Sequence, residues 1–187
     1  MFEEYTSLTA EEAAHYCEGT ESQPVRAEIR RRVLPDEFVL EIGCGNGIDA
    51  GRYPPDRYEG IDVSPALIAE AQARHPGHKF RCLDVLENEF VCREVVFAKS
   101  VLEHAPDTDT AVAMLREMLR IATRVVFVAW HTPPDADGPE QLRRVMGHFG
   151  KTIHQNRYRL APFAAAICGR PWFVSRHGPH HLWEIQC

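Results

Sequence analysis

Two glycines and an aspartate stand at spacings that suit the binding of a nucleoside. Gly43 and Gly45 directly follow Phe38–Ile42, an apolar segment that is typical of a strand. Without a Cβ, such residues let the chain turn sharply and bring its N–H groups close to a ligand. Asp62 ends the next apolar segment 19 positions after Gly43, near the spacing at which a carboxylate accepts from both ribose hydroxyls. The pattern predicts a ligand that contains a nucleoside.

A dinucleotide is one such ligand, and it is disfavoured here. Dinucleotide sites use G-x-G-x-x-G, in which the third glycine lets the following helix pack closely. Counted from Gly43, that position holds Ile48. An NAD-dependent oxidoreductase therefore stays as the weaker hypothesis.

Four segments together resemble a known family. Val39–Gly47, which reads Val-Leu-Glu-Ile-Gly-Cys-Gly-Asn-Gly, is similar to the first motif of the class I S-adenosylmethionine-dependent methyltransferases, E/D-x-G-x-G-x-G. Gly60–Pro65, Leu83–Asp84 and Ser100–Asp107 resemble later motifs of that family, in the same order. The resemblance is strong from about residue 38 to 130 and weak outside. It implies S-adenosyl-L-methionine as cofactor, S-adenosyl-L-homocysteine as product, and a seven-stranded sheet with one antiparallel strand near the C-terminus.

The resemblance also implies roles for individual residues. Asp62 would accept from the ribose hydroxyls and Asp84 from the adenine amino group, whereas Glu41 would hold the glycine loop and the ammonium group of the cofactor. Asp84 alone is also compatible with a capping carboxylate. The implied cofactor-binding positions are Glu41, Gly43, Cys44, Gly45, Asp62, Val63, Asp84, Val85, Lys99 and Ser100.

Histidines are the candidates for proton transfer. A sulfonium methyl is already activated, so the protein has mainly to align the nucleophile and exclude water. Where the acceptor is a hydroxyl or ammonium group, a base of near-neutral pKa helps. His131, after the fifth strand, is our first candidate and His104, after the fourth, is the second, although loop or packing roles stay open for both. His177, His180 and His181 lack further ligands at metal-binding spacing, so we expect a surface turn there and no metal.

Charge is divided unevenly along the chain, and this bears on the acceptor. The net charge is −6, yet residues 141–187 contain seven Lys or Arg and only Glu184 as an acid. Arginine binds carboxylate or phosphate through paired N–H groups. Arg157 and Arg159 are therefore candidate substrate-binding residues for an anionic acceptor, and Trp130 is a separate candidate for an aromatic part of the pocket. The alternative is that the arginines only balance the acidic remainder and that Trp130 packs in the core.

The elements that must position these residues alternate along the chain. Segments 38–42, 58–63, 79–83, 95–98 and 125–130 read as strands, and 172–175 and 182–187 as two more. Helical patterns cover 25–33, 65–74, 111–122 and 161–168, and Thr9–Glu12 has capping-box spacing. In Val125–Trp130 the side chains on both faces of the expected strand are apolar, as in a strand that is covered on both faces. The order predicts one α/β domain over residues 1–187, a Rossmann-like doubly wound, mostly parallel sheet with helices on both faces.

Ligands of such sheets bind at the carboxyl ends of the strands. The family places its acceptor-recognition elements before the first motif and after the fifth strand. We therefore expect residues 1–35 to form a helical lid and residues 131–170 a substrate-recognition insert.

Composition limits the kinds of partner that we expect for this protein. Hydrophobic residues make up 44% and charged residues 26%, as in ordinary globular domains, and a net charge of −6 disfavours nucleic acid and anionic lipid as generic partners. No apolar run reaches the roughly 18 residues of a membrane span. The N-terminus lacks a signal-peptide pattern, and the six cysteines form no C-x-x-C pair, so we expect a cytoplasmic location.

We therefore predict a methyltransferase that acts on an O or N atom of a small molecule, as a monomer or homodimer. Two alternatives stay open. One is a catalytically idle nucleoside-binding or regulatory module. The other is an RNA or protein methyltransferase that docks its substrate on the basic stretch.

Overall fold

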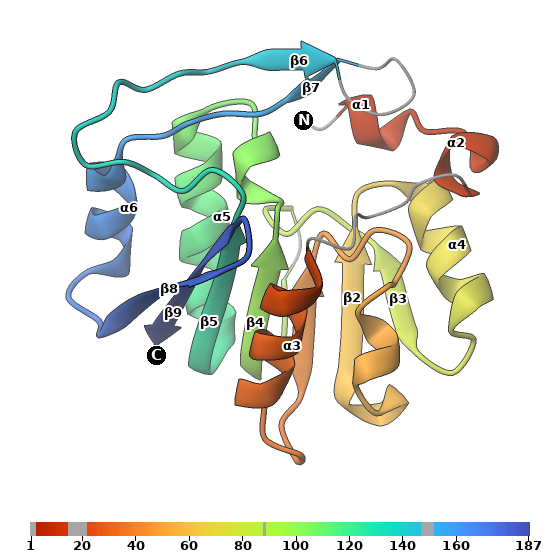
Figure 1. Ribbon diagram of the computed structural model, residues 1–187. Helices are drawn as coiled ribbons and strands as arrows, with labels where there is room; N and C mark the ends of the chain where they lie inside the picture. The colour runs from red at the N-terminus through yellow and green to blue at the C-terminus, as the bar shows by residue number, and fades with distance from the viewer. Residues whose placement is uncertain (1–2, 15–21, 88, 147–151) are drawn as a thin grey trace.

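The computed structural model describes residues 3–14, 22–87, 89–146 and 152–187. Its centre is a seven-stranded sheet with the order β3-β2-β1-β4-β5-β9-β8 (Figure 1). The first five strands pair in parallel, and β9 is antiparallel to both of its neighbours. This confirms the predicted mostly parallel sheet. The strands are β1 (Val39–Ile42), β2 (Tyr58–Asp62), β3 (Lys79–Cys82), β4 (Arg93–Lys99), β5 (Ala122–Trp130), β8 (Trp172–His177) and β9 (His180–Gln186).

Helices cover both faces of the sheet. In Figure 1, α3 lies in front of the strands and α5 behind them. Buried side chains of α3 and α4 belong to one hydrophobic cluster with the strands, and those of α5 and α6 belong to a second cluster on the other face. These helices are α3 (Gln23–Arg32), α4 (Pro65–Arg74), α5 (Thr108–Ile121) and α6 (Leu160–Ile167).

The two best-patterned helices begin at caps that the sequence indicates. The Ser64 hydroxyl accepts a hydrogen bond from the Leu67 N–H, with Pro65 in the first turn of α4. The Asp107 carboxylate accepts from the Thr110 N–H at the start of α5. These caps satisfy N–H groups that have no partner within the helix. Helix α4 begins close to the end of β2, where a ligand site is expected, whereas residues 100–107 separate the end of β4 from α5.

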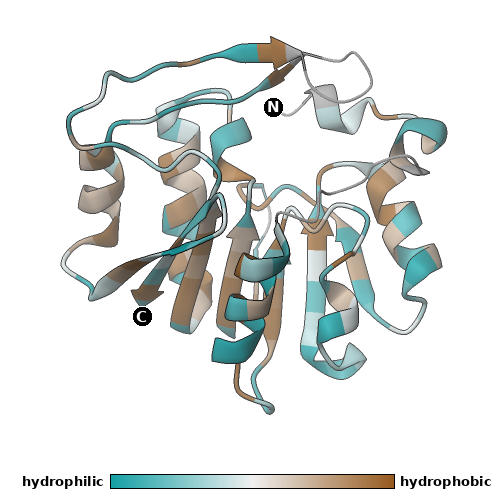
Figure 2. Ribbon diagram, in the orientation of Figure 1, coloured by the Kyte–Doolittle hydropathy of each residue, from teal (hydrophilic) through white to brown (hydrophobic). Residues whose placement is uncertain are grey.

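Strand β5 lies in the middle of the hydrophobic core. Residues 125–130 are all buried, as their double-sided apolar pattern predicts. Figure 2 shows that β4 and β5 are predominantly hydrophobic. Helix α5 ends at Ile121, and Ala122 already belongs to β5 although it continues the apolar stripe of the helix.

The connection from β1 to β2 departs from a regular alternation of strands and α-helices. Residues 43–57, all of which the structure describes, contain only the short 3-10 helices η2 (Ala50–Arg52) and η3 (Pro55–Arg57). Pro54 and Pro55 disfavour a longer helix, because proline lacks the N–H and restricts the residue before it. Helix α3 covers this face instead, with Val25 and Ile29 fully buried against the strands.

Two small units lie on the side at which the parallel strands end (Figure 1). The first consists of α1 (Glu3–Thr6) and α2 (Ala10–Ala14), where Thr9 and Glu12 form the predicted capping box. The second is an antiparallel pair, β6 (Arg144–Met146) and β7 (Thr152–His154), within the expected insert. Helix α3 packs on a face of the sheet, so within the described part of residues 1–35 only α1 and α2 lie at the strand ends, and their role as a lid stays a prediction. Residues 15–21 of that expected lid lie outside the described residues.

Candidate functional site

The glycine loop after β1 has a backbone that few other residues could adopt. Gly43, Gly45 and Gly47 have φ angles of 69°, 55° and 75°, in the left-handed region. A Cβ at Gly43 would lie 2.4 Å from Val101 Cγ2, closer than atoms can approach. The N–H groups of Gly43 and Cys44 both donate to the Ile61 carbonyl, at 2.8 and 2.9 Å. The loop is thus folded back onto the end of β2.

Asp62 fastens this loop from the other side. One carboxylate oxygen accepts from the Gly45 N–H and the other from the Ser64 N–H, each at 2.9 Å. Burial raises the pKa of Asp62, and hydrogen bonds from the backbone N–H groups of Ser64, Gly45 and Val63 oppose that rise. The two oxygens offer about four acceptor positions, so the three backbone N–H groups leave room for a further hydroxyl donor.

The structure brings the other expected adenosine-binding residues beside Asp62. The Leu83 N–H donates to the Asp62 carbonyl at 3.0 Å, which places Asp84 and Val85 next to the end of β2. Asp84 is half-buried, and its Oδ1 accepts from the Leu86 N–H at 2.9 Å, so it also has the turn-stabilising role that the sequence left open. Val63 and Val85 pack on the same hydrophobic cluster. This edge pairs two carboxylates with an apolar wall, which suits a sugar and a planar base.

Glu41 and Lys99 belong to a buried group of charges beneath the loop. Glu41 is 2% exposed and accepts a hydrogen bond from the Tyr58 hydroxyl. Burial, and next the nearby Asp49, raise the pKa of Glu41 well above its usual value. Burial, and next Arg26, lower the pKa of Lys99 to about 8. Glu41 is thus enclosed next to the loop, and its expected contact with the ammonium group of the cofactor stays a prediction.

The next two expected cofactor-binding residues, Cys44 and Ser100, have constrained positions in the structure. The Cys44 side chain is buried and directed back at Gly60, where an added Cβ would lie 2.9 Å from its sulfur. Ser100 has a φ of 52°, a left-handed conformation that is rare for a residue other than glycine. Its N–H donates to the Ala129 carbonyl at 2.8 Å, so the end of β4 is held against β5.

His131 stands between two buried side chains. Its backbone N–H donates to Glu103 Oε1 at 3.1 Å, and its ring is 5.4 Å from the ring of His180, at an interplanar angle of 73°. Glu103 is 1% exposed and His180 is 2% exposed, whereas His131 is exposed. The expected surface turn is therefore wrong for His180, because residues after β4 and β5 cover it.

His104 lies where three segments meet. It belongs to η4 (Leu102–His104), its Nδ1 contacts the His154 carbonyl oxygen, and its ring is 5.8 Å from that of Tyr5 in α1. Only an N–H can form a hydrogen bond with a carbonyl, so Nδ1 carries the hydrogen. In the neutral ring Nε2 keeps its lone pair, and His104 is therefore suited to accept a proton.

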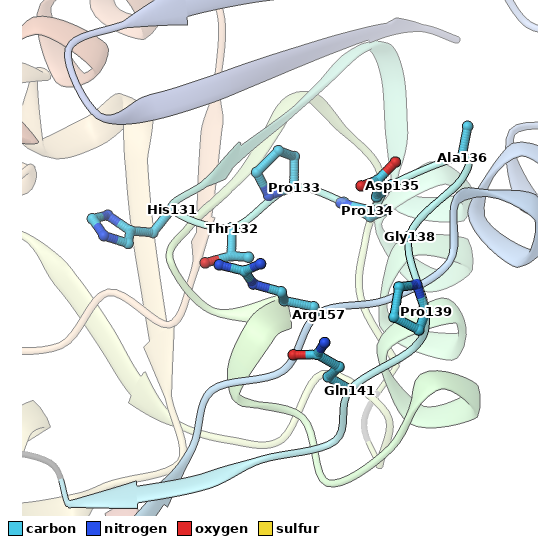
Figure 3. Close-up of a pocket in the computed structure, with 10 residues that line it drawn as sticks. All are labelled: His131, Thr132, Pro133, Pro134, Asp135, Ala136, Gly138, Pro139, Gln141 and Arg157. Atoms are coloured by element: carbon cyan, nitrogen blue, oxygen red, sulfur yellow. The ribbon is translucent and has the colours of Figure 1, made fainter.

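A cavity of about 510 Å³ adjoins the end of β5 within the expected insert. Its polar lining includes His131, Thr132, Asp135, Gln141 and Arg157, and prolines 133, 134 and 139 contribute apolar wall. Figure 3 shows the guanidinium end of Arg157 directed toward Thr132, with Gln141 close by. Among the described residues, no carboxylate forms an ion pair with Arg157. The cavity thus offers a cationic group to an anionic ligand.

Two expected substrate-binding residues lie elsewhere. Trp130 is fully buried, and its ring packs 5.5 Å from Phe163 and 5.3 Å from Trp183. The expectation that it contacts the acceptor is wrong, because the helix α6 and strand β9 enclose it. Arg159 precedes α6, is exposed, and does not line the cavity.

Asn156 is a site residue that the sequence analysis missed. It is fully buried, its N–H donates to the Glu103 carbonyl at 2.9 Å, and its Nδ2 donates to the Ala105 carbonyl at 2.6 Å. Its Oδ1 accepts from the Arg143 N–H at 2.7 Å. Asn156 thereby ties the insert to the segment after β4. No motif in the basic stretch signals this role.

Metal-binding clusters and membrane-spanning helices are both absent from the described ranges. Within them, no three His, Cys, Asp or Glu side chains are grouped so as to hold a metal ion. No helix in those ranges is both long enough and apolar enough to span a bilayer.

Comparisons with known proteins agree with this geometry. Residues 40–125 match the family model of a methyltransferase domain. The trans-aconitate 2-methyltransferase of Methylobacterium nodulans is 31% identical over 116 residues, which cover 58% of this chain and 44% of that protein. A trans-aconitate 2-methyltransferase of Escherichia coli is 37% identical over 76 residues, or 38% of this chain and 30% of the relative. The matched part thus spans less than half of these relatives.

Solved structures share the fold over almost the whole chain. The DhpI-SAM-HEP complex has a TM-score of 0.71 at 23% identity and covers 98% of this chain and 94% of that one. Magnesium protoporphyrin IX methyltransferase from Synechocystis, solved with bound SAH, has a TM-score of 0.69 at 16% identity, with coverages of 98% and 96%. At these identities the likeness establishes the fold.

Proposed function

We propose that this protein is a class I S-adenosylmethionine-dependent methyltransferase that transfers a methyl group from S-adenosyl-L-methionine to an O or N atom of a small molecule. The match of residues 40–125 to the family model of a methyltransferase domain supports the proposal. The observation that carries the proposal is the Asp62 carboxylate, which is bonded to Gly45 and Ser64 and retains acceptor positions at the carboxyl edge of the sheet. The name of the relatives, trans-aconitate 2-methyltransferase, supports a small-molecule acceptor.

The cofactor would lie along the ends of β1, β2 and β4. Asp62 would accept from the ribose hydroxyls and Asp84 from the adenine amino group, with Val63 and Val85 against the base. Backbone groups of the loop Gly43–Gly45 and of Lys99 and Ser100 would hold the methionine end. When bound, S-adenosyl-L-methionine supplies a methyl group on a positively charged sulfur, an electrophile that needs no metal. The acidic character of this edge suits such a cationic ligand.

The acceptor would occupy the cavity beside β5. Arg157 lines it, has no acidic partner among the described residues, and would bind a carboxylate or phosphate group of the acceptor. Arg159 would add to the positive potential from outside the cavity. The cavity walls would exclude water from part of the acceptor and hold it beside the end of β5.

A histidine would take the proton from the acceptor atom. His131 is exposed, borders the cavity, and has its main chain fixed by Glu103. His104 would be the alternative base, since its Nε2 carries a lone pair when Nδ1 bonds to the His154 carbonyl. We assign His131 first because only it also lines the cavity.

Calorimetry with S-adenosyl-L-homocysteine tests the proposal, with NAD as the comparison ligand. We expect heat of binding with the first and none with the second. Turnover is then followed as S-adenosyl-L-homocysteine formed with panels of carboxylate, phosphate and neutral acceptors. Absence of binding would contradict the cofactor assignment. Binding without turnover on any panel member would contradict the enzymatic part.

A further inference from the structure

His180 is buried at a place where a hairpin would ordinarily expose its residues. It begins β9 directly after the turn at residues 178 and 179, and it pairs with His177 at the tip of the β8–β9 hairpin. Its strand neighbour His181 is half-buried, whereas His180 is 2% exposed. Something beyond the hairpin must therefore cover the His180 ring.

The covering residues are the first ones after β4 and β5. Ser100 Oγ lies 3.3 Å from His180 Nε2, and the His131 ring lies 5.4 Å from the His180 ring. The ring planes meet at 73°, an edge-to-face arrangement that fixes the orientation of one ring relative to the other. His180 thus joins the two strand ends between which methyl transfer is proposed to occur.

The backbone of Ser100 is strained at this contact. A φ of 52° is strained for a residue with a Cβ, and such strain persists only where the surroundings enforce it. The bond from its N–H to Ala129 and the contact of its hydroxyl with His180 are the enforcing interactions. The Ser100 hydroxyl fixes the His180 ring in turn.

We propose that His180 is a positioning residue that orients the His131 imidazole. Glu103 fixes the main chain of His131, and His180, held by Ser100, restricts the rotation of its ring. An exposed histidine would otherwise sample several rotamers, and confining it to one places its nitrogen reproducibly toward the acceptor. The inference rests on the proposed function for one point, the role of His131 in proton transfer.

Two variants separate the two contacts of His180. His180→Gln keeps a hydrogen-bonding group near Ser100 and removes the ring, whereas His180→Phe keeps a ring beside His131 and removes the hydrogen bond. His181→Gln, at the next position of the same strand, is the control, because no ring contact joins His181 to His131 among the described residues. We expect His180→Gln to lower kcat about 10-fold with the acceptor KM and the cofactor Kd within 2-fold, and His180→Phe to retain more of kcat than His180→Gln.

A measurement that does not depend on activity completes the test. NMR of the His131 side chain should show a single rotamer in the wild type and in His181→Gln, and averaged rotamers in His180→Gln. If that variant fails to fold, Ser100→Ala should loosen His131 in the same spectra. An ordered His131 in His180→Gln, or a kcat equal to that of the wild type, would overturn the proposal. Failure of the proposed function would instead appear as absent turnover with the rotamer effect intact.

Discussion

One carboxylate oxygen of Asp62 accepts a 2.9 Å hydrogen bond from the N–H of Gly45 and so joins the glycine loop after β1 to the end of β2. The same carboxylate is the proposed acceptor for the ribose. Loop shape and ligand recognition therefore depend on a single side chain.

Replacing Asp62 by alanine should weaken S-adenosyl-L-homocysteine binding by about 10- to 100-fold, because bonds to a charged acceptor contribute about 1.5–3 kcal/mol. Calorimetry measures the change. Asp56→Ala removes an exposed carboxylate from the same connection and should leave the Kd unaltered. A Kd within 3-fold of the wild type in Asp62→Ala would contradict the ribose assignment.

Gly43→Ala should destabilise the protein by about 2–4 kcal/mol, since an added Cβ meets Val101 at 2.4 Å and the left-handed φ is strained. Urea unfolding measures this loss. The double variant Gly43→Ala/Val101→Ala removes the clash and keeps the strain, so part of the stability should return. No recovery in the double variant would show that the contact with Val101 is not the cause.

Arg157→Ala should raise the KM of a carboxylate or phosphate acceptor about 10- to 100-fold and spare the cofactor Kd, because the lost contact is a charge-assisted one. Arg159→Ala, outside the cavity, should change KM less. Steady-state kinetics with one charged and one neutral acceptor distinguish these cases. Equal effects of the two variants would indicate that Arg157 acts through the overall positive electrostatic potential and not through a contact in the cavity.

His131→Gln should lower kcat by about 100-fold or more, the usual contribution of general-base catalysis, with the cofactor Kd unchanged. His104→Gln should lower kcat less. Single-turnover kinetics report the chemical step directly. A larger loss in His104→Gln would transfer the role of base to His104.

From the lowered pKa of Lys99 we predict that the stability of the protein depends on pH. Its pKa is lowered to about 8, whereas an unfolded lysine titrates near 10.4. Between these values the unfolded chain binds more protons, so this residue makes the free energy of unfolding rise with pH. The free energy of unfolding of the wild type, minus that of Lys99→Met, should therefore increase with pH, by up to about 1.4 kcal/mol per pH unit.

Urea unfolding at several pH values from 7.5 to 9.5 measures this difference. Lys79→Met, which removes a lysine whose side chain is 55% exposed, controls for the loss of charge. Parallel pH profiles for the wild type and Lys99→Met would contradict the prediction.

Local sequence patterns predict most of the fold. The apolar stretch 125–130, the Ser64 cap and the capping box at Thr9 each specify their element through neighbours in the chain. The glycine loop and Asp62 are also predictable, because their relation is a spacing along two adjacent strands.

Features that depend on distant segments were not predictable. The sequence leaves Trp130 open between a pocket and a core role, and the packing of α6 and β9 around it gives the core role. His180 reads as a turn residue, yet residues 80 and 49 positions earlier enclose it. Asn156 acts on a segment about 50 residues away, and only tertiary packing brings the two together.

Strand order has a consequence for how the sheet assembles. β8 precedes β9 in the chain, but β9 lies between β5 and β8. β8 pairs only with β9, so the hairpin that they form joins the sheet when β9 docks on β5, about 50 residues upstream, and loop closure of that length slows folding. We expect the β8–β9 hairpin to be the last part to gain protection against amide exchange during refolding, and the His131–His180 contact to form only at that stage.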